Sequence, residues 1–431
     1  MQRIALPSLE PRLQQRYELL VQGHLHSANK LASGISALPS VSSAFAATQA
    51  TWRFLKNERI TLSALAAPLR QEGLAQANAS DAPFVMLVLD WCKLAFAHAK
   101  EDQVALTHQT DVGYELTTAL LVSAANGAPL SPMEMLLKTK RGLFSTGPRV
   151  KNVSHLEQVG PLLEAAGHWG LSKPLLSVID READSVDHLR RWHAAGHLFL
   201  IRGDTRVVRW NDTSIKTGDL AKKMREQQQF QCLGTAEHGG KPAQLWVAQT
   251  AVTLTRAARK NVKDQRYKIA GPPLTLRLIV VQLRSEKGKV LAEWLLLTNA
   301  PSDLANAAKL AFCYYWRWRI ESYFKLLKSH GQQLESWQQK TGPAIARRLL
   351  IASMACVVVW KLQADVSPAS MKLKNILIRL SGRQTKRKKP HTAPALLAGL
   401  WVLLAMVELL QQVNLQELLQ LAKQLPFHDT A

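Results

Sequence analysis

The pattern of apolar and polar residues changes several times along the 431-residue chain, and each change predicts a different kind of structure. Apolar residues recur at helical spacing within residues 1–75, which predicts a small helical unit. Between residues 84 and 204, continuous apolar runs alternate with amphipathic segments, as is typical of an α/β core. Residues from about 204 to 300 are rich in strand-like segments. From residue 301 onward the pattern is helical again.

Two strands of the α/β core are predicted to be buried on both faces. Residues 84–89 and 175–179 are continuous apolar runs, the pattern of strands that are covered by helices on either side. Asp90 ends the first run, and Asp180 ends the second. Because open α/β sheets place their sites beyond the carboxyl ends of such strands, both aspartates are candidate site residues.

Charged residues also recur at helical spacing in the segment 314–328. At about 100° per residue, Tyr314, Arg317, Glu321 and Lys328 fall within an arc of roughly 60° on one helical face. A carboxylate between an arginine and a lysine suits a group that binds a metal beside a phosphate. The same stripe also fits an ordinary helix with salt bridges between neighbouring turns. Taken alone, the segment favours the second interpretation, and the rest of the chain decides between them.

The charge balance favours a polyanionic partner. Lysine and arginine total 55 against 32 aspartates and glutamates, a formal net charge of +23. An excess of this size favours nucleic acid over a membrane surface. The four cysteines have neither metal nor disulfide spacing, which fits a reducing cytoplasm and argues against a zinc site. The N-terminus lacks an apolar signal core, so we expect a cytoplasmic protein.

One segment, residues 393–410, has the length and apolarity of a membrane span, and a basic run at 386–389 precedes it. Pro394, Gly399 and Glu408 interrupt the apolar pattern, and no second span is convincing. We therefore expect a buried helix in a C-terminal bundle and no association with a membrane.

Asp90, Asp180 and Glu321 together indicate a carboxylate cluster for divalent metal. Two hard cations held a few ångströms apart would activate a water or a 3′-hydroxyl and stabilise the leaving oxygen in phosphodiester cleavage. Carboxylate oxygens suit Mg²⁺, or alternatively Mn²⁺. Glu182 and Asp184 are rivals to Asp180, which we prefer because it directly ends the strand.

These residues match the motifs of a known family. The chain resembles the DDE transposases of bacterial insertion sequences, in the IS-four-like group marked by the signature Y-x2-R-x3-E-x6-K, to which the transposon five transposase belongs. Tyr314, Arg317, Glu321 and Lys328 meet this signature in full. The second family motif, a strand followed by Asp-Arg-Glu-Ala-Asp, appears at residues 179–184.

The resemblance covers most of the chain and implies its organisation. Within the α/β class it implies an RNase H-like core, a mixed sheet with flanking helices interrupted by a β-strand insertion, with helical N-terminal and C-terminal regions. We expect a DNA-binding domain at 1–75, a catalytic domain at 76–340 with the insertion at about 204–300, and a dimerisation region at 341–431. Residues 1–75 equally fit a packing domain with a solvated basic face.

The resemblance also implies roles for single residues. Asp90, Asp180 and Glu321 would be the catalytic residues and bind the metal ions. The residues implied in contacts with DNA phosphates, the DNA backbone or a flipped nucleotide are Tyr314, Arg317, Lys328, Trp294, Arg202, Arg256 and Arg53. Trp294 would stack on the flipped base. It equally fits a core tryptophan within a strand.

The implied function is metal-dependent cut-and-paste transposition, with strand nicking, hairpin formation and resolution at transposon ends, and strand transfer. The implied partners are double-stranded DNA at terminal inverted repeats, target DNA, and a second copy in a homodimeric synaptic complex. The protein would work in the bacterial cytoplasm on the nucleoid. The alternative is a catalytically inactive DNA-binding regulator or inhibitor of transposition.

Overall fold

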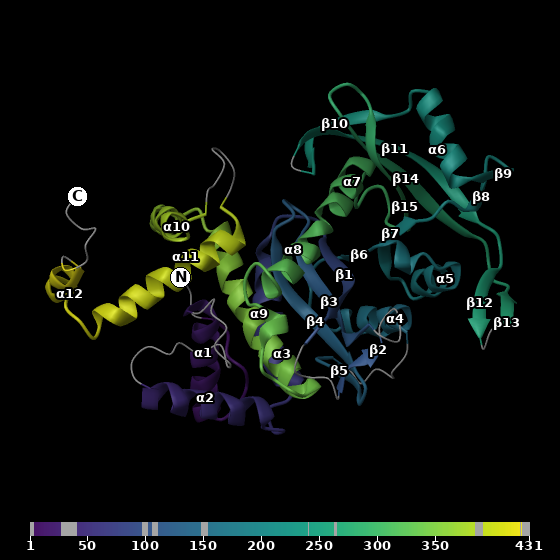
Figure 1. Cartoon of the computed structure of the whole chain (residues 1–431). Helices are drawn as coiled ribbons and strands as arrows, with labels where there is room; N and C mark the ends of the chain where they lie inside the picture. The colour runs from purple at the N-terminus through teal and green to yellow at the C-terminus, as the bar shows by residue number, and fades with distance from the viewer. Residues whose placement is uncertain are drawn as a thin grey trace.

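The fold is built on one mixed sheet with helices on both faces (Figure 1). The computed structural model describes residues 4–26, 41–96, 102–105, 111–147, 154–239, 241–262, 265–383, 391–422 and 424. Its central strands are β1 (Val85–Leu94), β3 (Val112–Ser123), β4 (Pro129–Thr139), β6 (Leu175–Ile179) and β7 (Leu198–Gly203).

The order of the central strands is β4-β3-β1-β6-β7. Strands β1, β6 and β7 are parallel, β3 is antiparallel to β1, and β4 is antiparallel to β3. One reversed strand beside a parallel trio is the arrangement of an RNase H-like core, so the expected fold class is confirmed. Two short strands, β5 (Gly142–Ser145) and β2 (Val104–Ala105), pair with β4 and β3.

Strand β4 was not predicted from the sequence. Its residues include Pro129 and Pro132, and proline is depleted in strands because it cannot donate a ladder hydrogen bond. The pairing of β3 with β4 shifts register next to both prolines, where Val122 and Leu120 face them. The prolines therefore occupy irregular positions of the ladder, which an apolar pattern does not reveal.

The insertion extends the central sheet. Its strands in this sheet are β8 (Val207–Trp210), β9 (Thr213–Lys216), β10 (Gln231–His238), β11 (Lys241–Leu254), β14 (Leu274–Arg284) and β15 (Val290–Thr298). Strand β15 pairs antiparallel with β7 and so joins the insertion to the core. The insertion also holds a separate hairpin of β12 (Ala258–Val262) and β13 (Gln265–Ile269), and a helix, α6 (Thr217–Glu226), that was not predicted.

Helices form two layers around this sheet. One face carries α4 (His155–Ala166), α5 (Val186–Ala194) and α6, and the other carries α7 (Ala307–Trp316), α8 (Trp318–Leu327) and α9 (Gly342–Ala364). Alternate residues of β1 divide between the two layers. Leu87 and Leu89 pack on the α4 side, whereas Met86 and Val88 pack on the α8 side. This alternation directs Asp90 toward α8.

The helical ends of the chain meet around α9. They comprise α1 (Pro11–His26), α2 (Val41–Lys56), α3 (Leu62–Ala79), α10 (Pro368–Leu380) and α11 (Ala393–Leu410). The last helix, α12 (Leu415–Ala422), lies beyond the far end of α11 (Figure 1). Buried Arg347 of α9 donates to the carbonyls of Ile60 (2.8 Å) and Leu55 (2.9 Å), which ties the N-terminal helices to α9. Helix α3 crosses the predicted boundary at residue 75, and the division into domains stays a prediction.

Two helices are long and apolar enough to cross a membrane by length and composition. Helix α9, which was not predicted as a span, is 94% buried inside the protein. The prediction that residues 393–410 form a buried helix is wrong for most of their length, because 22% of α11 is buried. Its N-terminal half packs against α10, while its C-terminal half is largely exposed. The basic run at 386–389 lies outside the described residues.

Candidate active site

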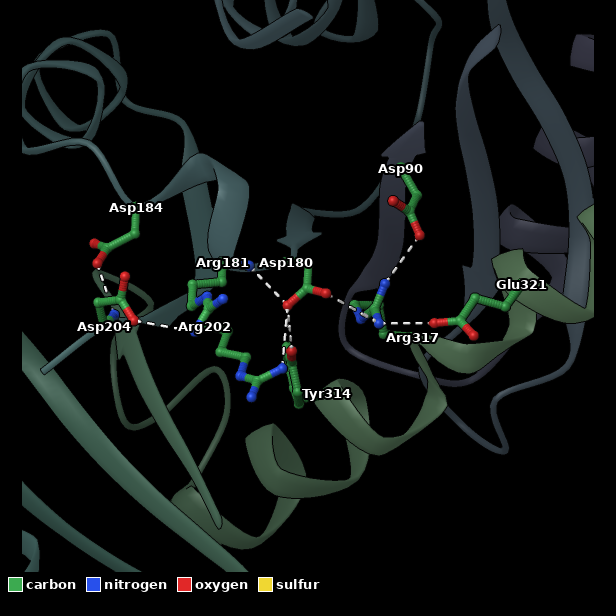
Figure 2. A network of polar contacts seen from close by, with 9 residues as sticks. All are labelled: Asp90, Asp180, Arg181, Asp184, Arg202, Asp204, Tyr314, Arg317 and Glu321. Atoms are coloured by element: carbon green, nitrogen blue, oxygen red, sulfur yellow. Dashed lines mark hydrogen bonds and ion pairs between the residues drawn. The ribbon is translucent and has the colours of Figure 1, made fainter. Parts of the chain in front are cut away.

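Three adjacent parallel strands place three polar side chains in a row. The parallel pairing of β1 with β6 ends at Leu89 and Ile179, so Asp90 and Asp180 each stand one position beyond it. On β7, Arg202 stands one position beyond the partner of Ile179. Because successive strand residues alternate between faces, these three side chains point away from α4 and toward α7 and α8 (Figure 2).

The sequence predicted that strand β1 ends at Asp90, and this prediction is wrong. The strand continues to Leu94 as the antiparallel partner of β3, with Asp90 opposite Thr118. The apolar run stops at Asp90 because β6 stops there, so the side chains beyond it are no longer covered on that side. The apolar pattern therefore marks the end of the parallel sheet and not the end of the strand.

The segment 314–328, which the sequence predicted to lie on one helix, is divided between two helices that meet at Arg317. The N–H of Arg317 donates to the carbonyl of Tyr314 at 3.1 Å, and the N–H of Ile320 donates to the carbonyl of Arg317 at 3.1 Å. Both bonds span three residues rather than four, so the backbone tightens into a 3₁₀-like turn here. Arg317 is thus the joint between α7 and α8.

The guanidinium of Arg317 contacts three carboxylates at once (Figure 2). Its Nη1 lies 3.0 Å from Oδ2 of Asp90, and its Nη2 lies 2.9 Å from Oε1 of Glu321 and 3.3 Å from Oδ2 of Asp180. The Arg317 side chain is 6% exposed, whereas those of Asp90, Asp180 and Glu321 are 18%, 30% and 28% exposed. Three carboxylates from β1, the end of β6 and α8 therefore converge on one buried cation.

Asp180 is surrounded by further hydrogen-bond donors. The hydroxyl of Tyr314 donates to its Oδ1 at 3.0 Å, and the backbone N–H of Arg181 donates to the same oxygen at 2.7 Å. Nη1 of Arg202 lies 3.7 Å away. Burial alone would raise the pKa of Asp180, but Arg317 and these donors together lower it below its usual range. Asp180 is therefore held as an anion.

Asp90 has fewer compensating partners. Burial raises its pKa to about 6, although Arg317 and the backbone N–H of Trp91 favour the charged form. The negative charges of Asp180 and Glu321 add to the rise. The pKa of Tyr314 is also raised, first by burial, so its hydroxyl keeps its proton and remains a donor. The two strand-end aspartates thus differ in pKa because one is solvated and hydrogen-bonded more fully than the other.

The donor chemistry of this cluster fits a divalent metal ion. Asp90, Asp180 and Glu321 supply carboxylate oxygens, the ligands that Mg²⁺ and Mn²⁺ prefer, and they already surround a cation in the form of the Arg317 guanidinium. Among the residues that the structure describes, no group of three His, Cys, Asp or Glu side chains lies in a position to hold a metal ion. The three carboxylates converge on the guanidinium that lies between them.

The rivals of Asp180 have other partners. Asp184 pairs with Arg206 and accepts the backbone N–H of Asp204 at 2.7 Å, and its side chain is 4% exposed. Glu182 is 65% exposed and lies 3.2 Å from Nε2 of His155. The ion pairs of Arg317 among the described residues are with Asp90, Asp180 and Glu321. Of Asp180, Glu182 and Asp184, Asp180 is the one that pairs with Arg317, and its role as a metal ligand stays a prediction.

The other predicted DNA-contacting residues are spread over the molecule. Lys328 ends α8 and turns from the carboxylates to the carbonyl of Lys93 and to Glu335, which divides the predicted stripe. Arg256 is exposed between β11 and β12 and lines a pocket of about 490 Å³. Arg53 is exposed on α2, far along the chain from the carboxylates.

An aromatic pocket beside the cluster was not predicted as such. Trp294 of β15 is 8% exposed, and its ring centroid lies 5.2 Å from that of Tyr314. On its other side, Trp294 lines a pocket of about 550 Å³ together with Trp316, Trp318 and Arg319. Trp318 is 50% exposed, which is unusual for so large an apolar side chain. The density of aromatics around residues 314–318 was the signal in the sequence.

Comparison with known proteins finds a similarity over part of the chain. Residues 144–358 match the family model described as the transposase DDE domain. In overall structure, the chain is similar to a piggyBac transposase in a synaptic complex with hairpin DNA, at 10% identity and a TM-score of 0.41 over 96% of this chain and 76% of that one. It is also similar to the Drosophila P element transposase in a strand transfer complex, at 12% identity and a TM-score of 0.22 over 95% and 81%. The residues matched by the family model include Asp180 and Glu321.

Proposed function

We propose that this protein is a cut-and-paste DNA transposase of the Y-R-E-K signature group that uses divalent metal ions. The observation that carries the proposal is the convergence of Asp90, Asp180 and Glu321 on one cation. The two aspartates follow the last parallel pair of β1 and β6, whereas Glu321 comes from α8, beyond the whole insertion. Contacts assembled from such distant parts of the chain are expected of a site rather than of a surface salt bridge.

The chain's own residues would bind the metal ions and position the DNA phosphates beside them. Asp90, Asp180 and Glu321 would bind Mg²⁺ or Mn²⁺, which activates the attacking oxygen and stabilises the leaving oxygen when bound. Tyr314, which keeps its proton, would donate to a phosphate oxygen near the scissile bond. Arg202 stands beside Asp180 and would neutralise an adjacent phosphate.

The DNA-binding part of the proposal is supported by charge. The formal net charge is +23, and phosphate contacts by lysine and arginine dominate the affinity of proteins for DNA. Lys328, Arg256 and Arg53 are proposed backbone contacts. We propose that the DNA is that of terminal inverted repeats and target sites, in the bacterial cytoplasm and without a membrane. Recovery of the protein only with detergent would contradict the last point.

The test is cleavage of DNA that carries the ends of the element around this gene. Purified protein with Mg²⁺ should nick one strand at each end, form a hairpin and open it, whereas protein with EDTA should bind the same DNA without cutting. Tight binding without nicking in Mg²⁺ or Mn²⁺ would instead favour the inactive regulator. Short inverted repeats that bracket the gene supply the substrate for this experiment.

We further propose that the pocket of Trp294, Trp316 and Trp318 receives the flipped base. It is about 550 Å³ in volume, has three tryptophans and Tyr315 in its lining, and adjoins Tyr314. Aromatic faces stack on any base, and enzymes that extrude a nucleotide hold it in this way. Arg319 at the pocket wall also donates to the carbonyl of Gly127 at 2.8 Å, which fixes it there.

Replacement of Trp294 should slow hairpin formation more than the first nick. Stacking on one base contributes about 1–3 kcal/mol, so Trp294→Ala should slow the hairpin step by roughly 5- to 150-fold. Fluorescence of 2-aminopurine at the extruded position would report the flip. Trp294→Phe retains a stacking face and should lose less. Trp318→Ala removes an exposed side chain of the same pocket and so creates no buried cavity. Equal rates in all three variants would contradict the pocket assignment.

The exposed C-terminal helices are the proposed dimer surface. Large apolar side chains of α11 and α12 are 39–58% exposed, namely Val402, Met406, Val407, Leu410, Leu415, Leu419 and Leu421. An apolar surface of this kind on a soluble protein marks an interaction site. A second copy would cover it and hold two DNA ends together.

Charged residues on this surface should prevent dimerisation. Met406→Glu combined with Leu410→Glu should leave the protein monomeric by sedimentation velocity, both free and with DNA ends, because burial of two charges opposes apolar association. Gln412→Glu adds a charge at an exposed polar position beside them and serves as the matched control. A double variant that still pairs two DNA ends would place the dimer contact elsewhere.

A further inference from the structure

The position of Arg317 is unusual for a residue expected to contact DNA. Its guanidinium is 6% exposed and lies beneath the three carboxylates, which are three to five times more exposed. From solvent, an ion reaches the carboxylates before it reaches Arg317. A phosphate, in contrast, cannot contact the guanidinium while it stays in this place. The described conformation therefore satisfies the carboxylates but not the expected DNA contact.

The guanidinium also retains an unused hydrogen-bond donor. Its Nε is buried and has no partner among the residues that the structure describes, whereas both terminal nitrogens are paired. A buried donor without a partner is uncommon, and it leaves Arg317 able to donate one more hydrogen bond. Arg317 stands at the joint of α7 and α8, where the helical hydrogen bonding already changes, so its backbone is not fixed within a continuous helix.

We propose that Arg317 is the internal counter-ion of the metal site, which exchanges with a divalent cation when DNA binds. The proposal rests on the proposed function. Without metal, the guanidinium neutralises part of the charge of Asp90, Asp180 and Glu321. The same oxygens cannot hold the guanidinium and a divalent ion together, so Arg317 must withdraw before metal binds. A DNA phosphate then offers the withdrawn guanidinium a new anionic partner.

This exchange makes DNA and metal mutually dependent. The binding free energy that DNA gains from the released guanidinium offsets the free energy needed to separate Arg317 from the carboxylates. DNA therefore strengthens metal binding, and linkage requires that metal strengthen DNA binding by the same factor. The free protein would bind metal weakly, and a DNA end would strengthen that binding. Metal would thus be held mainly where a substrate is present. In the competing interpretation Arg317 stays in place and merely aligns the carboxylates, so its loss would weaken metal binding.

The experiment is calorimetric titration of the full chain with Mn²⁺, without DNA, at neutral pH. Arg317→Gln should bind Mn²⁺ about tenfold more tightly than the unchanged protein, within the usual range of coupling between two sites. Arg317→Lys keeps a cation but not the paired contacts and should be intermediate, and it tests the proposal if the glutamine variant does not fold. Lys325→Gln removes a positive charge from an exposed position of the same helix and should bind like the unchanged protein.

The possible results separate this proposal from the proposed function. If Arg317→Gln and Arg317→Lys bind Mn²⁺ no more tightly than the unchanged protein, the exchange is wrong. The carboxylate site remains in that case, provided that Asp90→Asn abolishes the binding. If Asp90→Asn leaves Mn²⁺ binding unchanged in every background, the carboxylates do not hold metal and the proposed function fails with it. Tighter Mn²⁺ binding by Arg317→Gln that is lost with Asp90→Asn supports both.

Discussion

Asp90→Asn and Glu321→Gln should each abolish metal-dependent cleavage of the element's ends while DNA binding persists. Each change keeps the shape of the side chain and removes its charge, so the metal loses a ligand and the leaving oxygen loses stabilisation. Removal of one group that stabilises transition-state charge typically costs about 10²- to 10³-fold in rate, and loss of a metal ligand should reach the upper end. The cleavage rate in Mg²⁺ is the measurement.

The matched control for these variants is Glu182→Gln. Glu182 lies two residues after Asp180 and carries the same charge, but it is 65% exposed and contacts His155. The Glu182→Gln variant should cleave DNA at nearly the rate of the unchanged protein. All three variants should bind the ends with an affinity that falls as salt rises, because phosphate contacts release counterions. Undiminished cutting by Asp90→Asn or Glu321→Gln would remove that residue from catalysis.

Acid should loosen the joint between α1 and the segment that follows α8. His24 is 4% exposed, its Nδ1 lies 2.6 Å from Oε1 of Gln332, and its ring centroid lies 5.6 Å from that of Trp337. Burial, helped by the positive charge of Arg348, lowers the pKa of His24 to about 3 from its usual 6.5. The native protein therefore holds this histidine neutral.

The direction of the pH effect follows from this lowered pKa. Below pH 6.5 the unfolded chain binds a proton that the folded chain refuses until about pH 3. The contribution of neutral His24 to the free energy of unfolding is therefore fully present above pH 6.5 and declines as pH falls toward 3. Each pH unit in this window costs about 1.4 kcal/mol, so the loss by pH 4.5 is on the order of 2–3 kcal/mol.

Denaturant unfolding at several pH values would measure this loss. His24→Asn retains a donor toward Gln332 but does not titrate, so its free energy of unfolding should fall less between pH 7 and pH 4.5. His168→Asn alters an exposed histidine and should follow the unchanged protein. Parallel curves for the unchanged protein and His24→Asn would show that His24 is protonated without cost and that the joint is not acid-sensitive.

The positions of the strand-end residues could be predicted from the sequence, whereas their contacts could not. Apolar runs locate Asp90 and Asp180 because burial on both faces ends where the parallel sheet ends. The spacing from Tyr314 to Glu321 predicts a shared helical face, and both residues do face the cluster. That spacing assumes an unbroken helix. It could not show that the backbone changes at Arg317 or that Lys328 turns away.

Features that depend on distant partners escaped the sequence pattern. Strand β4 carries Pro129 and Pro132 at register shifts, and only its pairing with β3 makes it a strand. The C-terminal half of α11 is apolar, a pattern that predicts burial, but none of residues 401–410 is buried. Trp294 fitted both a core position and a stacking position, and it has features of each, since it is 8% exposed and lines the aromatic pocket.

The pairing of β15 with β7 has a consequence for protein engineering. Leu296 of β15 is the direct partner of Arg202, so the strand that carries Trp294 is also the neighbour that covers the edge of the catalytic core. Excision of residues 204–300 would leave β7 with a bare row of N–H and C=O groups, a template for aggregation. A shortened enzyme would therefore have to retain β15, or replace it with another edge-covering strand, before its chemistry could be judged.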